Sequence, residues 1–199
     1  MSKESGYETA INLAIEKLRT VDVVNRCTLL GLPVPQSNRL AFRAFGTDMT
    51  LHLDDFQLLL ANSNKPAKVS DRILVLHYLQ CETPIHVTHD LISFRQMEGG
   101  IFYWQAFLSR SIQPLIQRIG NNLDTLRANL NRLDWHPLPM GDLGAHIHAI
   151  GNVSVTLVYH PGDEEFGPDA EFLFDASIKQ IYPTEDAAVL ASRMCLSLL

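Results

Sequence analysis

The stretch that decides the fold reads His146-Ile147-His148-Ala149-Ile150, Gly151-Asn152, Val153-Ser154-Val155-Thr156-Leu157-Val158-Tyr159-His160. The residues on either side of Gly151-Asn152 alternate or are β-branched, and a two-residue connection that begins with Gly is typical of a type II′ hairpin turn. An acidic loop follows, and the apolar run Glu171 to Ser177 closes the stretch. The sequence therefore predicts antiparallel strands here, with most of the candidate chemistry on or beside them.

Outward from this stretch, a second hairpin is predicted over residues 39–53, with its turn at Gly46-Thr47. In that register Phe42 faces Leu51, Leu40 faces Leu53 and Ala44 faces Met49, all on the buried side. Residues 54–60 are expected to form a short helical turn, and Trp135 to Gly141 reads as a linker. Apolar residues at helical spacing predict the helices, which are expected over 7–27, 72–81, 101–119 and 122–133, and from a Thr184 cap onward. The predicted fold class is α+β, an antiparallel sheet built from hairpins and packed against several helices. We expect a single domain over 1–199, with a weak internal boundary near 135–141.

Composition limits the partners that we expect. The net charge is −6, and the 16 Lys and Arg residues are scattered, so we expect no nucleic acid partner. Because no apolar stretch reaches the roughly 18 residues that span a bilayer, we also expect no membrane partner. The three cysteines lack a C-x-x-C pair, and the first residues lack the apolar run of a signal peptide. These features favour a cytoplasmic protein.

Two histidines on the first strand of the central hairpin are the first candidate ligands. His146 and His148 are two residues apart, so on a strand their side chains point the same way. In the expected register they share an apolar face with four other residues, Ile150, Val153, Val155 and Leu157. The pair could ligate a divalent metal ion, or one His could be the axial ligand of a tetrapyrrole. The alternative is that both side chains face water or bond to neighbouring backbone.

The second candidate group follows the central hairpin. His160 ends its second strand, and Asp163, Glu164 and Glu165 come directly after it. These side chains could ligate a hard cation, or two of them could act as general acid and base. The alternative is an acidic loop that is simply solvated.

A third group could bind an organic cofactor. Gly99-Gly100 ahead of a helix could offer free amides to an anion, with Arg95 nearby and with Tyr103 and Trp104 as aromatic contacts. Asp175, at the end of an apolar strand, is either a site residue or the cap of the following turn. The aromatic residues could equally belong to the core.

Several stretches together resemble an uncharacterised bacterial and archaeal family known as domain of unknown function 3786. They begin near Gly31 and cover most of the chain from there: 31–34, 70–79, 93–95 with 99–103, 161–166, 174–177 and 183–186. The resemblance implies a one-domain protein common in anaerobes, sometimes joined to iron–sulfur modules or found among corrinoid and one-carbon genes. An iron–sulfur or corrinoid protein is therefore the implied partner. The resemblance supplies no catalytic residues, and His146 and His148 lie outside its pattern.

Three functions remain open from the sequence. The first is an accessory protein that holds a tetrapyrrole (haem or corrinoid) or a metal ion for a partner enzyme of anaerobic metabolism. The second is a metal-assisted hydrolase or lyase, in which His146, His148 or His160 holds the ion and Glu164 or Glu165 is the base. The third is a non-catalytic interaction module that docks through its acidic loop.

Overall fold

Two antiparallel sheets organise the chain, of which the structure, a computed structural model, describes residues 3–199. The first is three-stranded, with the order β1 (Arg39–Ala44), β2 (Thr47–His52), β3 (Leu58–Leu60). The second is five-stranded, in the order β4-β8-β7-β6-β5. Its strands are β4 (Leu91–Ser93), β5 (Trp135–Leu138), β6 (Leu143–Ile150), β7 (Val153–His160) and β8 (Asp169–Asp175). The α+β fold class and the antiparallel, hairpin-built sheet are thus confirmed.

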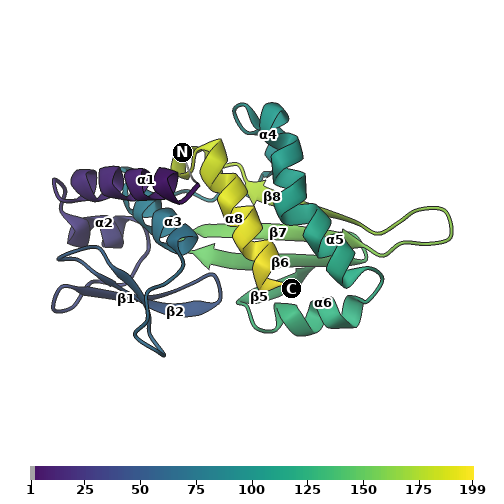
Figure 1. The fold of residues 1–199 in the computed structure, drawn as a ribbon, viewed down its shortest axis with the longest axis horizontal. Coiled ribbons are helices and arrows are strands. Elements are labelled where there is room, and N and C mark those ends of the chain that lie inside the picture. Colours follow the sequence, from purple (N-terminus) through teal and green to yellow (C-terminus); the bar gives the residue numbers. More distant parts are fainter. Residues whose placement is uncertain (1–2) are drawn as a thin grey trace.

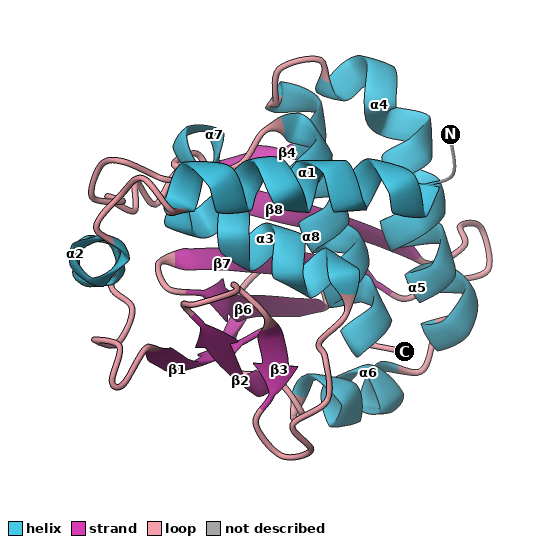
Figure 2. Ribbon diagram, turned by 60° about the vertical axis from the view of Figure 1, so that its left-hand side comes forward, coloured by secondary structure: helices cyan, strands magenta, loops and turns pink. Residues whose placement is uncertain are grey.

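Helices pack against both sheets. Figure 1 shows α8 and α5 crossing in front of β6, β7 and β8, and Figure 2 shows α1 and α3 side by side. The helices are α1 (Lys3–Leu18), α2 (Val23–Leu29), α3 (Val69–Leu79), α4 (Gly100–Phe107), α5 (Gln113–Ile119), α6 (Leu123–Leu130), α7 (Ile178–Ile181) and α8 (Thr184–Ser197). A 3₁₀ turn (Phe94–Gln96) precedes α4, and a π-helical segment (Leu108–Ile112) joins α4 to α5. Among residues 3–199, none of the helices combines the length and apolar character needed to cross a bilayer.

The central hairpin forms as predicted. β6 and β7 pair antiparallel, and Ile150 pairs with Val153, so Gly151-Asn152 is the connection. Gly151 has φ +51°, and a Cβ there would lie 2.0 Å from the hydroxyl of Tyr78 on α3. Only glycine therefore fits this turn, both for its backbone conformation and because α3 lies against it.

The 39–53 hairpin also forms, but its register differs from the prediction by two residues. Leu40 pairs with Leu51 and Phe42 with Met49, and the turn is Phe45-Gly46 rather than Gly46-Thr47. Both turn residues have positive φ, +52° and +74°, as a type I′ turn requires. Since a shift of two residues keeps every side chain on its face, the predicted buried side was still correct.

Four local predictions were wrong. Residues 7–27 form two helices, because Asp22 accepts a hydrogen bond from the Asn25 amide and starts α2. Residues 58–60 are a strand, β3, rather than part of a helical turn. Trp135–Leu138 forms β5, whose Pro137 is tolerated because the strand lies at the sheet edge. Thr184 does not cap α8; its hydroxyl donates to the carbonyl of Glu98 at 2.5 Å.

Long-range polar contacts hold the layers in place. Asp71 on α3 and Arg193 on α8 form a buried ion pair at 2.7 Å, with 2% and 9% of their side chains exposed. The His77 imidazole lies 2.5 Å from the carboxylate of Asp186 across the same two helices. Because each pair joins residues more than 100 positions apart, both fix how α8 lies on α3.

Candidate functional site

The face of the five-stranded sheet that reaches solvent carries imidazoles. Residues paired across antiparallel strands project on the same face. The strand pairing aligns one residue from each of the five strands in a row across the sheet. From β5 to β4 these residues are His136, His146, Thr156, Leu173 and Ser93. In this row His136 is exposed, Thr156 is buried, and the other three are half-buried. We call this side, including His148 and Ser154 in the adjacent row, the open face.

The opposite side of the same strands is the core face. Its adjacent row runs Trp135, Ile147, Val155, Phe174 and Ile92. All except the half-buried Trp135 are buried, and the helices cover this side. Alternate residues of each strand therefore divide into a packed apolar layer and a solvent-reaching layer.

A β-bulge places the two predicted histidines on the open face. The pairing shifts register between His148 and Ile150, so His146 lies opposite Thr156 and His148 opposite Ser154. The expectation that they share a face with Val155 and Leu157 was therefore wrong, because one extra residue in a strand reverses the faces beyond it. The imidazoles consequently avoid the cost of burial in the apolar core.

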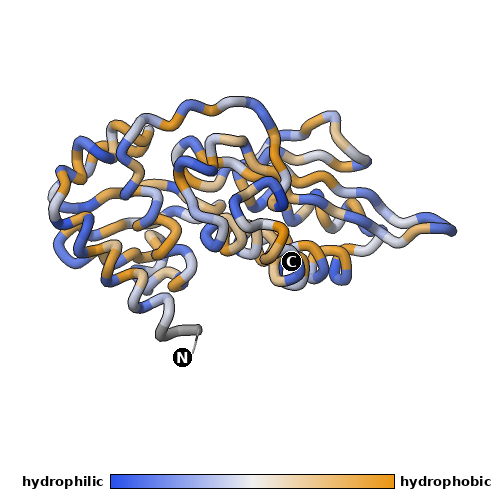
Figure 3. Tube along the Cα trace, turned by 90° about the horizontal axis from the view of Figure 1, so that it is seen from above, coloured by the Kyte–Doolittle hydropathy of each residue, from blue (hydrophilic) through white to orange (hydrophobic). Residues whose placement is uncertain are grey.

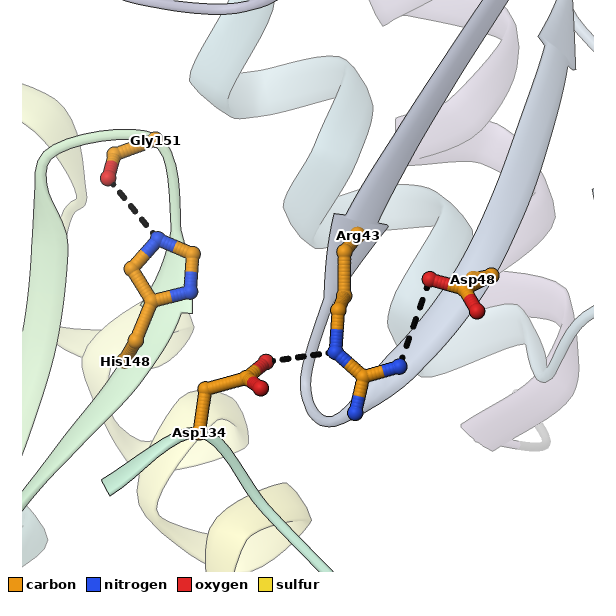
Figure 4. A network of polar contacts seen from close by, with 5 residues as sticks. All are labelled: Arg43, Asp48, Asp134, His148 and Gly151. Atoms are coloured by element: carbon orange, nitrogen blue, oxygen red, sulfur yellow. Dashed lines mark hydrogen bonds and ion pairs between the residues drawn. The ribbon is translucent and has the colours of Figure 1, made fainter.

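His148 has a fixed tautomer. Its Nε2 lies 2.9 Å from the carbonyl oxygen of Gly151, as Figure 4 shows, and a carbonyl can only accept. The neutral ring therefore carries its proton on Nε2 and has its lone pair on Nδ1. The backbone amide of His148 donates to the carbonyl of Asp134, whose carboxylate binds Arg43 at 2.6 Å. This network joins the bulge to the end of β1.

His146 lies at the centre of the imidazole group. Burial lowers its pKa, and the nearby rings of His136, His148 and His89 lower it further, against an opposing effect of Asp175. His146 is therefore neutral at pH 7, which is the form that ligates metals. The rings of His136 and His146 stand 4.6 Å apart between centroids, with a 36° tilt.

Sequence reasoning missed His136 and His89 as members of this group. His136 lies in β5, Trp135-His136-Pro137-Leu138. The proline made these residues look like a linker, although an edge strand tolerates proline. His136 could have been found if residues 135–138 had been predicted as a strand. Such a strand, paired with β6, places His136 opposite His146. His89 lies outside regular structure, and only the tertiary fold brings it to the end of β8.

Asp175 caps the turn that surrounds it. Its carboxylate accepts hydrogen bonds from the amides of Thr88, His89 and Ser177 and from the Thr88 hydroxyl, at 2.7–3.0 Å. Burial would raise the pKa of Asp175, but these hydrogen bonds lower it to about 2. The structure thus places this predicted site residue beside the open face, with its oxygens already engaged.

The acidic loop projects away from the open face. It extends to the far right in Figure 1, and its tip is coloured hydrophilic in the view of Figure 3. The carboxylate of Asp163 accepts from the amides of Phe166 and Glu165, at 2.7 and 2.8 Å, and these bonds lower the pKa of Asp163. Glu164 and Glu165 are exposed. The loop is therefore a closed, solvated turn.

His160 stands at the loop end of β7. Its Nδ1 lies 2.8 Å from Asp142, and both side chains are at least half exposed. His146 lies opposite Thr156, so along β7 the two imidazole sites are separated by roughly 13 Å, or four residues at about 3.3 Å each. The structure thus divides the six predicted metal ligands between two places. Among the side chains that the structure describes, no three from His, Cys, Asp or Glu lie close enough to hold a metal ion together.

The third predicted group lies on the 3₁₀ turn and α4. The Arg95 guanidinium carbon lies 4.1 Å from the Trp104 ring centroid, and Trp104 stacks on the buried Phe107. Tyr103 is 49% exposed. These residues form an exposed aromatic and cationic surface, remote in sequence from the imidazoles of the open face.

The comparisons with known proteins give one family and no characterised relative. A family model described as "Domain of unknown function (DUF3786)" matches residues 22–197. Among curated proteins and among solved structures, none matches the chain.

Proposed function

The chain belongs to the DUF3786 family, and from this premise we propose that it is an accessory protein that binds a cofactor on the open face for a partner enzyme. The cofactor is a tetrapyrrole, haem or corrinoid, or else a divalent metal ion. The observation that carries the proposal is the group of imidazoles on a solvent-reaching sheet face that the core does not require.

His146 is the proposed axial ligand. It is half-buried at the centre of the group, and its lowered pKa keeps the imidazole neutral and able to donate its lone pair. His136 lies directly opposite on β5 and is exposed, so it is the neighbour best placed to contact the same group. A neutral imidazole is the form in which histidine binds both haem iron and other transition metals.

The geometry favours a tetrapyrrole over a bare ion. A structural metal ion usually requires four protein ligands, and the residues that the structure describes offer no ready group of three. A tetrapyrrole needs one axial nitrogen and an apolar surface for its macrocycle. The open face offers half-buried apolar side chains around the histidines, namely Leu138, Val158 and Leu173.

An open face also suits an accessory role. A flat group bound there would keep its second side exposed, where a partner enzyme could reach it. The family resemblance suggests that this partner is an iron–sulfur or corrinoid protein of anaerobic metabolism, and we propose that the two meet in the cytoplasm.

The enzyme alternative has less support from the geometry. A metal-assisted hydrolase needs its base beside the ion, yet Glu164 and Glu165 are exposed on the loop beyond His160. The interaction-module alternative needs only the solvated acidic loop, and docking through that loop is compatible with the accessory role.

Cofactor titration tests the proposal. Purified protein is titrated without oxygen with haem and, separately, with cobalamin, and the visible spectrum is recorded. Wild type is expected to take up one of the two stoichiometrically, and His146→Ala to lose the axial-ligand bands. His52→Ala, on β2 of the other sheet, is the matched control and should behave like wild type.

Two results would contradict the proposal. One is a wild-type protein whose visible spectrum shows no bound haem or cobalamin in either titration, and which retains no metal after dialysis against Zn²⁺, Co²⁺ or Ni²⁺. The other is an unchanged spectrum in His146→Ala, which would move the ligand away from the open face.

A further inference from the structure

Carboxylates line the open side of β8. Every second residue of this strand is buried in the core, and the residues between them reach the open face. These outward residues are Asp169, Glu171, Leu173 and Asp175. Because three of the four are acidic, β8 gives the open face a row of negative charge that runs past the imidazoles.

The other four strands of the sheet provide no basic side chain to balance β8. Their outward positions hold histidine, serine, threonine, glycine, leucine and valine, and neither lysine nor arginine. Histidine is largely neutral at pH 8. At that pH the strand positions of the open face therefore carry carboxylates and no opposing charge.

The charges that reach His146 have the same sign. Asp175 is the carboxylate that acts on the pKa of His146, and the other groups that act on it are imidazoles. Burial raises the pKa of Asp175, but its hydrogen bonds lower that pKa to about 2, so Asp175 is ionised at neutral pH. A ligand bound to His146 would therefore meet a fixed negative charge.

Two arginines beside the open face are already matched by carboxylates. Partial burial raises the pKa of Glu171, Asp169 raises it further, and Arg95 lowers it, so Arg95 lies close to Glu171. At the other end of the face, Arg43 binds the carboxylate of Asp134 at 2.6 Å, as Figure 4 shows. Neither guanidinium thus leaves the open face with a net positive charge.

The two tetrapyrroles differ in charge at the rim of the ring. Haem carries two propionate carboxylates, whereas the side chains around a corrin ring are mainly uncharged amides. Propionates beside the acidic residues of β8 would be repelled, and the face has no arginine or lysine to bind them. Amide N–H groups would instead donate hydrogen bonds to the same carboxylates.

We propose that the open face selects a corrinoid over haem through the carboxylates of β8. This inference rests on the proposed function, because it names the cofactor that His146 would bind. Glu171 is exposed and is best placed to accept a hydrogen bond from a rim amide. The oxygens of Asp175 already accept hydrogen bonds, so Asp175 acts through its charge.

Binding constants of the full chain test this selection. The protein is titrated at pH 8 with haem and with cobinamide, a corrinoid that keeps the rim amides and carries no nucleotide phosphate, and the visible spectrum is followed. Cobinamide should bind about tenfold more tightly than haem or better. Haem dimethyl ester, whose propionates carry no charge, should also bind more tightly than haem.

Charge reversal at Glu171 identifies the residues responsible. Glu171→Lys should tighten haem binding by about fivefold or more and weaken cobinamide binding. Glu16→Lys is the matched control, because Glu16 is exposed on α1, which packs against α3 in the helical layer. Its binding constants should equal those of wild type. Since both glutamates are exposed, both variants should keep the wild-type circular dichroism spectrum and melting temperature.

The possible failures are distinguishable. Tighter binding of haem than of cobinamide in wild type, with haem binding unchanged in Glu171→Lys, would overturn the selection and leave the proposed function standing. Equal shifts in Glu171→Lys and Glu16→Lys would also overturn it, because net charge and not the open face would then be responsible. Binding of neither tetrapyrrole would overturn the selection together with the tetrapyrrole form of the proposed function.

Discussion

The open face and the core face belong to the same five strands, yet their residue types have different physical reasons. On the core face every position has a packing reason, since Ile147, Val155 and Phe174 are buried beneath the helices. On the open face the paired residues include His136 and His146, which packing does not require. The comparison teaches that a sheet face that reaches solvent, and not the buried core, is where to look for this protein's chemistry.

The largest expected effect is a difference in unfolding free energy between substitutions at two adjacent residues of β8, Phe174 and Leu173. Phe174→Ala removes a fully buried side chain from the core face and should cost about 3–5 kcal/mol of unfolding free energy. Leu173→Ala, on the open face, should cost no more than about 1.5 kcal/mol, because Leu173 is only half-buried. Urea denaturation measures both. Equal losses would remove the distinction between the faces.

A smaller effect is expected at Asp175, at the end of β8 beside the open face. Asp175→Ala removes the acceptor of four hydrogen bonds and should cost on the order of 1–2 kcal/mol at pH 7. Asp169→Ala, an exposed position at the other end of β8, should change stability by less than about 0.5 kcal/mol.

The pH dependence of Asp175 has a definite sign. Its pKa is lowered to about 2 in the folded protein, below the ordinary value near 3.9 of an unfolded aspartate. The stabilisation is therefore present above pH ~4 and is lost as the pH falls through about 2. Denaturation of wild type and Asp175→Ala should converge over that window, and a constant difference down to pH 2 would contradict the turn-capping role.

The smallest expected effect lies on the open face. His146→Gln should change stability at pH 8 by less than about 0.5 kcal/mol, since no core packing is lost. The folded pKa of His146 is lowered, so below pH ~6.5 the unfolded chain binds more protons and wild type loses stability. The variant should therefore become the more stable of the two on acidification. Parallel pH profiles in thermal denaturation would show that the His146 environment is unimportant.

Local pattern was enough to predict much of the fold. Gly151-Asn152 between alternating residues predicted the central hairpin, and apolar spacing predicted most of the helices. The buried side of the 39–53 hairpin was correct despite its shifted register, because a shift of two residues keeps the faces. The dipeptide Phe45-Gly46 was not predicted as the turn, since a bulky residue rarely adopts positive φ.

The candidate site was only partly predictable. His146 and His148 were found by their spacing, but which face they occupy depends on a one-residue bulge that the alternating pattern does not reveal. The acidic loop was found as a motif, yet only the strand geometry shows that it points away from the imidazoles.

The sequence by itself determined most of the longer elements of this protein, because helix and strand periodicity and glycine turns act over a few neighbouring residues. Only the tertiary structure decided which of those elements meet. Pairing of β5 with β6 sets His136 beside His146, and folding brings Asp71 to Arg193 over 122 positions. Such contacts depend on chain closure over long separations, and local residue preference carries no information about them.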